Sequence, residues 1–209
     1  MKVLIADDHA MIRAGLRQTL AKAFSGVEIG EAQKAQEALD LIRKKKWDLV
    51  ILDISMPGRS GLDVLPDIQL ARPELPVFVM SMHSEDQFAV RVLQAGAAGF
   101  ISKAAPPEEL VLAVRKVLSG ARYVSASVSQ ALIQGIGKST GRPAHDRLSD
   151  RELQVMCMFA SGKANKQVAT ELCISVKTVS TYRALILEKM NFQTTAEITR
   201  YAIKNGLVE

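Results

Sequence analysis

The sequence predicts an α/β domain followed by an all-α domain. Over residues 1–119, short apolar runs alternate with segments of helical periodicity, whereas from Leu148 onward only helical periodicity is found. Residues 120–147 are rich in glycine, serine and threonine, a composition typical of linkers. A chain of 209 residues is comfortable for two domains. We therefore expect domains over 1–119 and 148–209, joined by a linker over 120–147 whose apolar patch, 131–133, is compatible with a short helix.

The first 119 residues predict five consecutive β-α units. Strands are expected at 3–6, 27–32, 49–53, 77–80 and 99–102, and helices at 11–24, 35–46, 62–70, 88–95 and 108–118. Strands that alternate with amphipathic helices favour right-handed crossovers and a parallel sheet covered on both faces. We therefore expect a flavodoxin-like, doubly wound sheet of five parallel strands.

The composition predicts a soluble cytoplasmic protein with no membrane partner. Hydrophobic residues make up 48% and charged residues 23% of the chain, and no apolar run approaches the roughly 18 residues of a membrane span. The opening residues, MKVLIADD, place acidic side chains where an export signal would continue its apolar stretch. Cys157 and Cys173 lie in apolar helical patterns, so we expect both to be small core thiols.

The net charge of +5 is unevenly distributed along the chain. Residues 1–119 carry 15 basic and 15 acidic side chains, residues 120–147 carry 4 and 1, and residues 148–209 carry 8 and 6. The basic excess favours a polyanion partner for the C-terminal part. A mildly basic surface that binds nothing is the alternative.

Acidic, hydroxyl and amino side chains follow four of the expected strands. Asp7 and Asp8 come after the first strand, and Asp53 ends the apolar third strand. Strands one and three are neighbours at the switch point of a doubly wound sheet, so the three carboxylates converge and repel one another. Mg²⁺ suits such a site. Ser81 and Lys103 follow strands four and five, where they would hold a phosphoryl group that a carboxylate nucleophile accepts.

Each of these residues also has a structural interpretation. An acid pair after a strand is more often a helix cap, Asp53 could cap the next turn, and Lys103 alone would be solvated surface. Their coincidence at the carboxyl ends of four different strands favours the functional site.

The C-terminal part predicts a helix-turn-helix. Ser149 and Glu152 form a capping-box pattern at the start of one helix. A short helix at 166–172, a tight turn and a longer helix capped by Ser175 follow. The surface of the longer helix that would meet base edges carries Lys177, Thr178, Ser180, Thr181 and Ala184, and Tyr182 and Arg183 flank it within reach of phosphates. An ordinary solvated helix face is an equally good interpretation of this composition.

The stretches VLIADDH, VILDISMPGRSGLDVL, VMSMHS and AGAAGFISK closely resemble the receiver domain of bacterial two-component response regulators. The resemblance implies that Asp53 is the phosphoacceptor and that Mg²⁺ is bound by Asp7 or Asp8, by Asp53 and by the carbonyl of Ser55. It also implies that Ser81 and Lys103 contact the phosphoryl group and that Phe100 is the aromatic switch residue. Many receivers have proline directly after the lysine, where this chain has Ala104.

The stretch LSDRELQVMCMFASGKANKQVATELCISVKTVSTYRALILEKM resembles the LuxR-type helix-turn-helix, and its pairing with a receiver resembles the NarL/FixJ subfamily. Ser180, Tyr182 and Ala164 depart from the common pattern of Lys, His and Ser. By the same analogy the last helix offers Ile198, Tyr201 and Ala202 for dimerisation. Packing inside their own domain is the alternative for these three residues.

The resemblance implies a transcription regulator that is not an enzyme, with a histidine kinase as phosphodonor, double-stranded DNA as target and a homodimer on DNA or after phosphorylation. His9, His83 and His145 are isolated, so we expect them to be ordinary polar residues. Two alternatives remain open at this point: a phosphohydrolase with an Asp nucleophile, and a receiver that works without phosphate.

Overall fold

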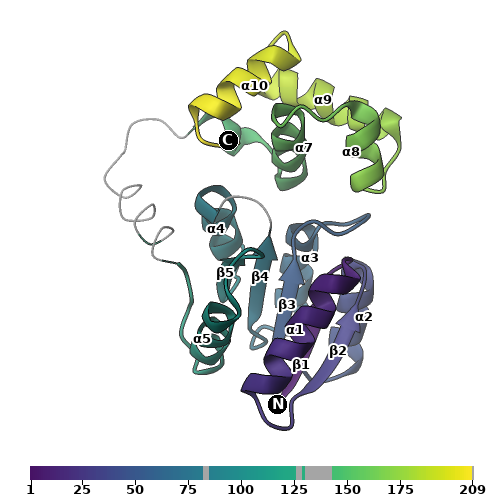
Figure 1. Ribbon diagram of the computed structural model, residues 1–209. Coiled ribbons are helices and arrows are strands. Elements are labelled where there is room, and N and C mark those ends of the chain that lie inside the picture. The colour runs from purple at the N-terminus through teal and green to yellow at the C-terminus, as the bar shows by residue number, and fades with distance from the viewer. Residues whose placement is uncertain (82–84, 126–128, 130–142, 209) are drawn as a thin grey trace. The chain divides into compact units, whose positions relative to one another are not determined.

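The chain divides into two compact units, residues 1–134 and 135–209, each of which is described here by itself. The structure is a computed structural model, and it describes residues 1–81, 85–125, 129 and 143–208. Figure 1 shows the helices and strands of both units. No helix among the described residues is long and apolar enough to cross a membrane.

The N-terminal unit is built on a sheet of five parallel strands in the order β2-β1-β3-β4-β5, which confirms the predicted doubly wound fold. The strands are β1 (Lys2–Ala6), β2 (Glu28–Ala32), β3 (Leu49–Asp53), β4 (Val77–Ser81) and β5 (Gly99–Ser102). The helices are α1 (Ala10–Ala23), α2 (Ala35–Lys44), α3 (Gly61–Ala71), α4 (Glu85–Gln94) and α5 (Pro107–Leu118). Helix α1 packs against α5 and helix α2 against α3, on opposite faces of the sheet (Figure 1).

The inner strands are buried because helices cover both faces of the sheet, whereas the edge strand β2 is partly exposed. Every residue of β3 and β4 is buried, which explains why their sequences are continuous apolar runs. Phe78, the second residue of β4, is completely inaccessible to solvent. The fully buried strand β3 therefore delivers Asp53 rigidly to the carboxyl edge of the sheet.

The first residues of the expected linker belong to the N-terminal unit. Tyr123 forms a parallel bridge with Gly99, and its backbone donates to Ala98 and accepts from Phe100. Its ring packs edge-on against Phe78, with the ring centroids 6.0 Å apart. A side chain at residue 99 would collide with the Tyr123 carbonyl, so glycine there permits the bridge. The short helix expected at 131–133 lies outside the described residues.

The C-terminal unit is helical, as predicted. It contains a 3₁₀ turn, η1 (Ala144–Arg147), and the helices α7 (Asp150–Ala160), α8 (Asn165–Glu171), α9 (Val176–Met190) and α10 (Thr195–Lys204). The capping box that starts α7 is confirmed, because Ser149 and Glu152 each accept a hydrogen bond from the other's backbone amide. Gly162, with a φ of 82°, follows the end of α7 in the left-handed conformation.

Two expectations about this unit need correction. Cys157 is buried as expected, but Cys173 is exposed, because it occupies the turn after α8 with a φ of 51° and does not continue the helix. Ile198 and Ala202 on α10 have no accessible surface, so packing within the domain accounts for them and neither side chain can meet a partner. Tyr201 is partly exposed, and its hydroxyl lies 3.0 Å from Nδ1 of His145.

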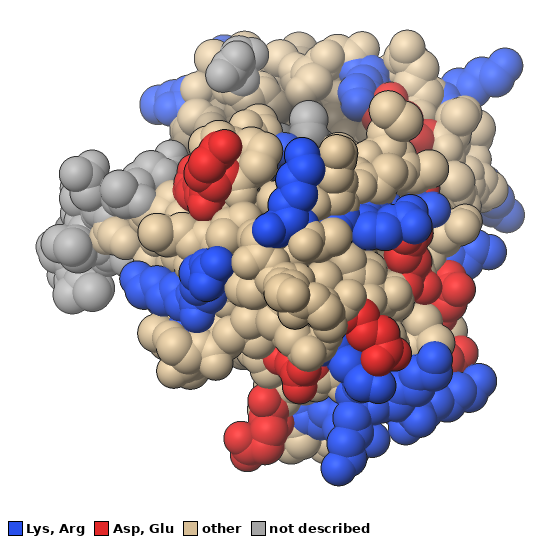
Figure 2. Space-filling model, turned by 60° about the horizontal axis from the view of Figure 1, so that its bottom comes forward, with Lys and Arg blue, Asp and Glu red and all other residues tan. Residues whose placement is uncertain are grey.

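Charges of both signs are mixed over the surface. Figure 2 shows one face of the molecule, on which blue basic side chains gather toward one side with red acidic side chains beside them. Helix α2 ends in an exposed basic run, Arg43 to Lys46. Exposed lysines at a helix end are normally solvated.

Candidate functional site: a buried acid and lysine cluster

The carboxyl ends of the parallel strands bring the predicted acidic residues together. Ala6 of β1 pairs with Leu52 of β3, so Asp7 and Asp53 each follow directly after paired residues of neighbouring strands. One ligand atom each from Asp7, Asp8, Asp53 and His9 lies within 4.8 Å of the others. The convergence predicted from the sequence is therefore present, and His9 joins it.

Lys103 joins two of these carboxylates. Its Nζ lies 2.6 Å from Oδ2 of Asp7 and 2.9 Å from Oδ2 of Asp53. The three side chains are no more than 3% exposed. Lys103 follows β5 and its backbone amide donates to the carbonyl of Ser81 on β4, so the sheet itself fixes the root of the side chain. One ammonium thus lies between two buried carboxylates and can neutralise only one of their two charges.

Burial and neighbouring charges shift the protonation of this cluster. Burial raises the pKa of Asp53 above its usual value, Lys103 opposes this shift, and Asp7 adds to it. Burial alone would lower the pKa of Lys103, but the adjacent Asp53 and Asp7 outweigh it and raise the pKa above 10.5. Lys103 therefore stays positively charged, and its charge only partly neutralises the carboxylate of Asp53.

The donor set fits a hard divalent cation. Oδ2 of Asp53 and Oδ1 of Asp8 are buried oxygens to which no well-formed hydrogen bond is made, although each lies near a nitrogen, of Lys103 and His9 respectively. Carboxylate oxygens are the ligands that Mg²⁺ prefers. Asp7, Asp8 and Asp53 could hold such an ion, and its charge would offset the excess negative charge of the cluster.

The loop after β3 is folded back onto Asp53. The Ser55 amide donates to Oδ1 of Asp53 over 3.1 Å. Ser60 caps α3 in a capping box with Asp63, which fixes where the loop ends. Gly61 then lies so close to the Asp53 carbonyl that a Cβ would collide with it. The sequence analysis did not single out Gly61, although a glycine at a helix start is a signal of close backbone approach.

Ser81 and Phe100 take the places expected of them within the sheet. Ser81 ends β4, is completely buried and pairs in register with Ser102 of β5. Phe100 is completely buried on β5 and pairs with Val79. Ser81 therefore lies on β4, the neighbour of β3, and Phe100 lies on β5, one strand further out, on the side from which Lys103 approaches Asp53.

His9 and Arg13 are the neighbours that the sequence analysis missed. Nδ1 of His9 lies 2.8 Å from Oδ1 of Asp8, and the His9 amide donates to Asp7. Arg13 is buried, and its guanidinium donates to the backbone carbonyl of Asp7 over 2.8 Å. The adjacency of His9 to the acid pair was a usable signal, whereas an arginine on an amphipathic helix normally indicates a solvated face.

The second candidate site is the exposed surface of α9. Lys177, Thr178, Ser180, Thr181 and Ala184 are exposed there, and Tyr182 is partly buried. The hydroxyls of Ser180 and Thr181 donate to carbonyls one turn earlier, and Ser180 also accepts from Asn165 of α8. Arg183 donates to Thr195 at the start of α10, so its side chain ties two helices together.

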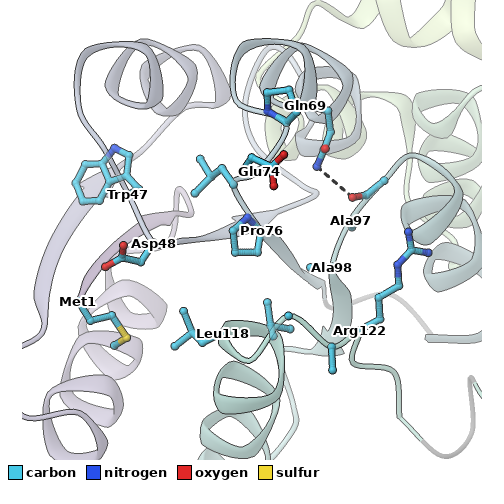
Figure 3. A pocket seen from close by; sticks show the side chains of 16 residues that line it. Met1, Trp47, Asp48, Gln69, Glu74, Pro76, Ala97, Ala98, Leu118 and Arg122 are labelled. Carbon is cyan, nitrogen blue, oxygen red and sulfur yellow. Dashed lines mark hydrogen bonds between the residues drawn. The ribbon is translucent and has the colours of Figure 1, made fainter.

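A separate cavity of about 720 Å³ lies at the opposite edge of the sheet. Met1, Asp48, Pro76 and Ala98, which line it, directly precede β1, β3, β4 and β5 (Figure 3). The acidic cluster of Asp7, Asp8 and Asp53 lies at the other end of the same strands, so the cavity is separate from it.

A five-stranded receiver sheet with this cluster, followed by a helix-turn-helix unit, defines a receiver-controlled DNA-binding regulator. The family model "Response regulator receiver domain" matches residues 3–115, and "Bacterial regulatory proteins, luxR family" matches residues 146–202. The chain belongs to the two-component response regulators of the NarL/FixJ subfamily. Members of this family regulate transcription and are not enzymes, so the phosphohydrolase alternative falls away.

Similar proteins cover almost the whole chain. Response regulator GacA of Pseudomonas aeruginosa is 36% identical over 100% of this chain and 98% of its own. Response regulator UvrY of Escherichia coli is 37% identical over 99% of this chain and 95% of its own. The structure of RcsB from Salmonella enterica serovar Typhimurium, bound to promoter rprA in the presence of the phosphomimetic BeF₃⁻, has a TM-score of 0.64 and 27% identity, covering 96% of this chain and 97% of that one.

Proposed function

We propose that this response regulator accepts a phosphoryl group on Asp53 from a histidine kinase. The observation that carries the proposal is Lys103, whose ammonium lies against both Asp7 and Asp53 in a buried cluster. A carboxylate that is buried and only partly neutralised is poised to react with an electrophile. Asp53 is such a carboxylate, because burial and Asp7 raise its pKa against the opposing effect of Lys103.

The transfer moves one phosphoryl group. An oxygen of Asp53 attacks phosphorus, the bond between phosphorus and the kinase imidazole breaks, and the imidazole nitrogen leaves with the electron pair. Lys103 then contacts a phosphoryl oxygen, and the Ser81 hydroxyl contacts another. Asp7, Asp8, Asp53 and the Ser55 carbonyl would hold Mg²⁺, which supplies charge neutralisation for the transferring group.

The response involves β4 and β5. The family resemblance implies that the hydroxyl of Ser81 moves toward the phosphoryl group and that the ring of Phe100 swings inward behind it. Both side chains are completely buried, so Phe100 already lies inward in this structure, and a shift of either side chain must be accommodated by the packing of the adjacent strand. The surface around α4 and α5 changes as a result, which favours dimerisation.

The output is sequence-specific binding of double-stranded DNA by α9. Lys177, Thr178, Ser180, Thr181 and Ala184 would face base edges, with Tyr182 beside them. The bond from Arg183 to Thr195 reduces the reach of that guanidinium toward phosphates. Ile198 and Ala202 are buried, so a second copy would meet α10 at its exposed face. That face includes Ile203, which is 56% exposed, and the exposed part of Tyr201.

A receiver that works without phosphate is the remaining alternative. It would not need the acid pair, the hydroxyl and the lysine together, and all of them are present at one edge of the sheet. The complete set therefore favours phosphorylation.

The decisive experiment measures phosphate incorporation from acetyl phosphate in the presence of Mg²⁺. Wild type should acquire phosphate that hydroxylamine releases, as an acyl phosphate does, and Asp53→Asn should acquire none. Asp48→Asn is the matched control, because Asp48 directly precedes the same strand at the other edge of the sheet and should leave labelling unchanged. Equal labelling of wild type and Asp53→Asn would contradict the proposal.

A further inference from the structure

We propose that Arg13 is a positioning residue that holds the Asp7–Asp8 pair in the geometry required for metal binding. The inference rests on the proposed function, since it assigns a role at the same site. It begins from a buried cation that the chemistry at Asp53 does not use. The side chain of Arg13 is 9% exposed although it lies on the outer layer of the unit, in helix α1.

The guanidinium of Arg13 connects strand β2 to the acidic loop, which is the segment of Asp7 and Asp8 after β1. Its Nη1 donates to the carbonyl of Asp7 over 2.8 Å, in a buried contact, and its Nε donates to Oε2 of Glu31 over 3.0 Å. Glu31 belongs to β2, which pairs with β1 along its whole length. The planar fork of an arginine allows both bonds at once, whereas a lysine offers only one point of charge.

Strand β2 thereby fixes both sides of residue 7. The amide of Asp7 donates to the carbonyl of Ala32, and its carbonyl accepts from Arg13, which Glu31 holds in place. Without the guanidinium the buried Asp7 carbonyl would lose a donor, and the peptide between Asp7 and Asp8 could rotate to find another. That rotation would move both carboxylates.

The surroundings contain a natural control. Arg17, one helical turn further along α1, pairs with the other oxygen of the same Glu31 over 2.9 Å. Its side chain is 56% exposed, and among the described residues it makes no bond to the backbone of Asp7 or Asp8. Arg13 and Arg17 therefore carry the same charge and pair with the same glutamate. They differ because Arg13 also donates to the Asp7 carbonyl.

The test compares Arg13→Met, Arg13→Lys and Arg17→Met in the full-length protein. Calorimetry measures the Mg²⁺ dissociation constant, and amide hydrogen exchange without Mg²⁺ measures the protection of the His9 amide, which donates to Asp7 Oδ1. Fluorescence of Trp47, the single tryptophan, verifies that the N-terminal unit is folded. We expect Arg13→Met to weaken Mg²⁺ binding about tenfold or more, as loss of an outer partner of a metal ligand does.

We also expect faster exchange at His9 in Arg13→Met, a smaller effect in Arg13→Lys, and wild-type behaviour in Arg17→Met. Folded Arg13→Met with wild-type Mg²⁺ affinity, or an equal loss in Arg17→Met, would overturn the inference. If Arg13→Met does not fold, Arg13→Lys decides by the same two measurements. If wild type binds no Mg²⁺, the proposed function fails, and exchange at His9 still decides whether Arg13 orders the loop.

Discussion

Lys103 Nζ lies 2.9 Å from Oδ2 of Asp53, and both side chains are almost completely buried. The same ammonium also contacts Asp7, so two carboxylates share one positive charge. This arrangement is costly in the resting protein, because one negative charge is left incompletely balanced in a region with little solvent. A bound cation would therefore neutralise the remaining negative charge of the cluster, and a bound phosphoryl group would change which groups Lys103 contacts.

We expect Asp53→Asn to be more stable than wild type near neutral pH. The pKa of Asp53 is raised in the folded state, so folding disfavours its ionised form and wild-type stability falls as the pH rises from about 3.8 through the folded pKa. Asparagine removes this loss and leaves Lys103 paired one to one with Asp7. Thermal unfolding as a function of pH should show the two proteins converging toward acid pH. An Asp53→Asn protein that is less stable near neutrality would refute the assignment, and Asp40→Asn, at an exposed position on α2, serves as the control.

Gly61→Ala should destabilise the N-terminal unit by about 1–3 kcal/mol, because the new Cβ would collide with the Asp53 carbonyl and backbone yields poorly. Phosphate incorporation should fall as well, since the collision displaces the end of β3. Gly15→Ala is the matched control: apart from the adjacent residues and backbone of α1, no atom of the described residues lies within 4 Å of its Cβ position, and alanine there should stabilise by about 0.5–1 kcal/mol. Denaturation followed by Trp47 fluorescence measures both changes, and equal effects would contradict the steric argument.

Tyr123→Phe should cost about 1 kcal/mol of stability in the N-terminal unit. The change removes the hydroxyl that donates to Glu109 over 2.7 Å and keeps the ring against Phe78. Glu109→Gln retains an acceptor and should cost less. The same fluorescence assay measures the change. If Tyr123→Phe leaves the free energy of unfolding unchanged, the bond from the hydroxyl to Glu109 is no stronger than its bonds to water in the unfolded chain.

Lys177→Ala should weaken binding to the preferred DNA site more than binding to unrelated sequences, and it should lower the slope of log affinity against log salt because one positive charge is lost. The reason is that Lys177 is exposed in the first turn of α9, on the surface proposed to face base edges. Fluorescence anisotropy over a salt series measures both quantities. Lys34→Ala, an exposed lysine of the N-terminal unit, controls for net charge, and an unchanged slope in Lys177→Ala would place the DNA elsewhere.

The sheet and the acidic cluster could be predicted because they depend on short-range patterns. Parallel strands end at one edge, so a residue such as Asp53 is placed as soon as its strand is recognised. Segment ends were less certain: α4 begins at Glu85 where the apolar pattern suggested Phe88. His83, one of the isolated histidines, lies outside the described residues.

The remaining features depend on contacts between distant segments. The burial of Arg13 requires Glu31 and the Asp7 carbonyl to be beside it, which helical periodicity does not reveal. Tyr123 follows a glycine-containing stretch that has the composition of a linker, and only its packing on Phe78 and β5 shows that it belongs to the sheet. The inward face of α10 was uncertain for the same reason, since its burial is decided by α7.

The turn between α8 and α9 carries the chain's one exposed thiol, Cys173, while the other cysteine, Cys157, is buried. A maleimide dye would therefore react at a single position in the natural sequence, because accessibility governs thiol modification. That position lies in the turn before α9, the helix proposed to enter the DNA groove, and is separated from it by Ile174 and Ser175. The unaltered protein thus carries its own attachment point for a fluorescent reporter of operator binding.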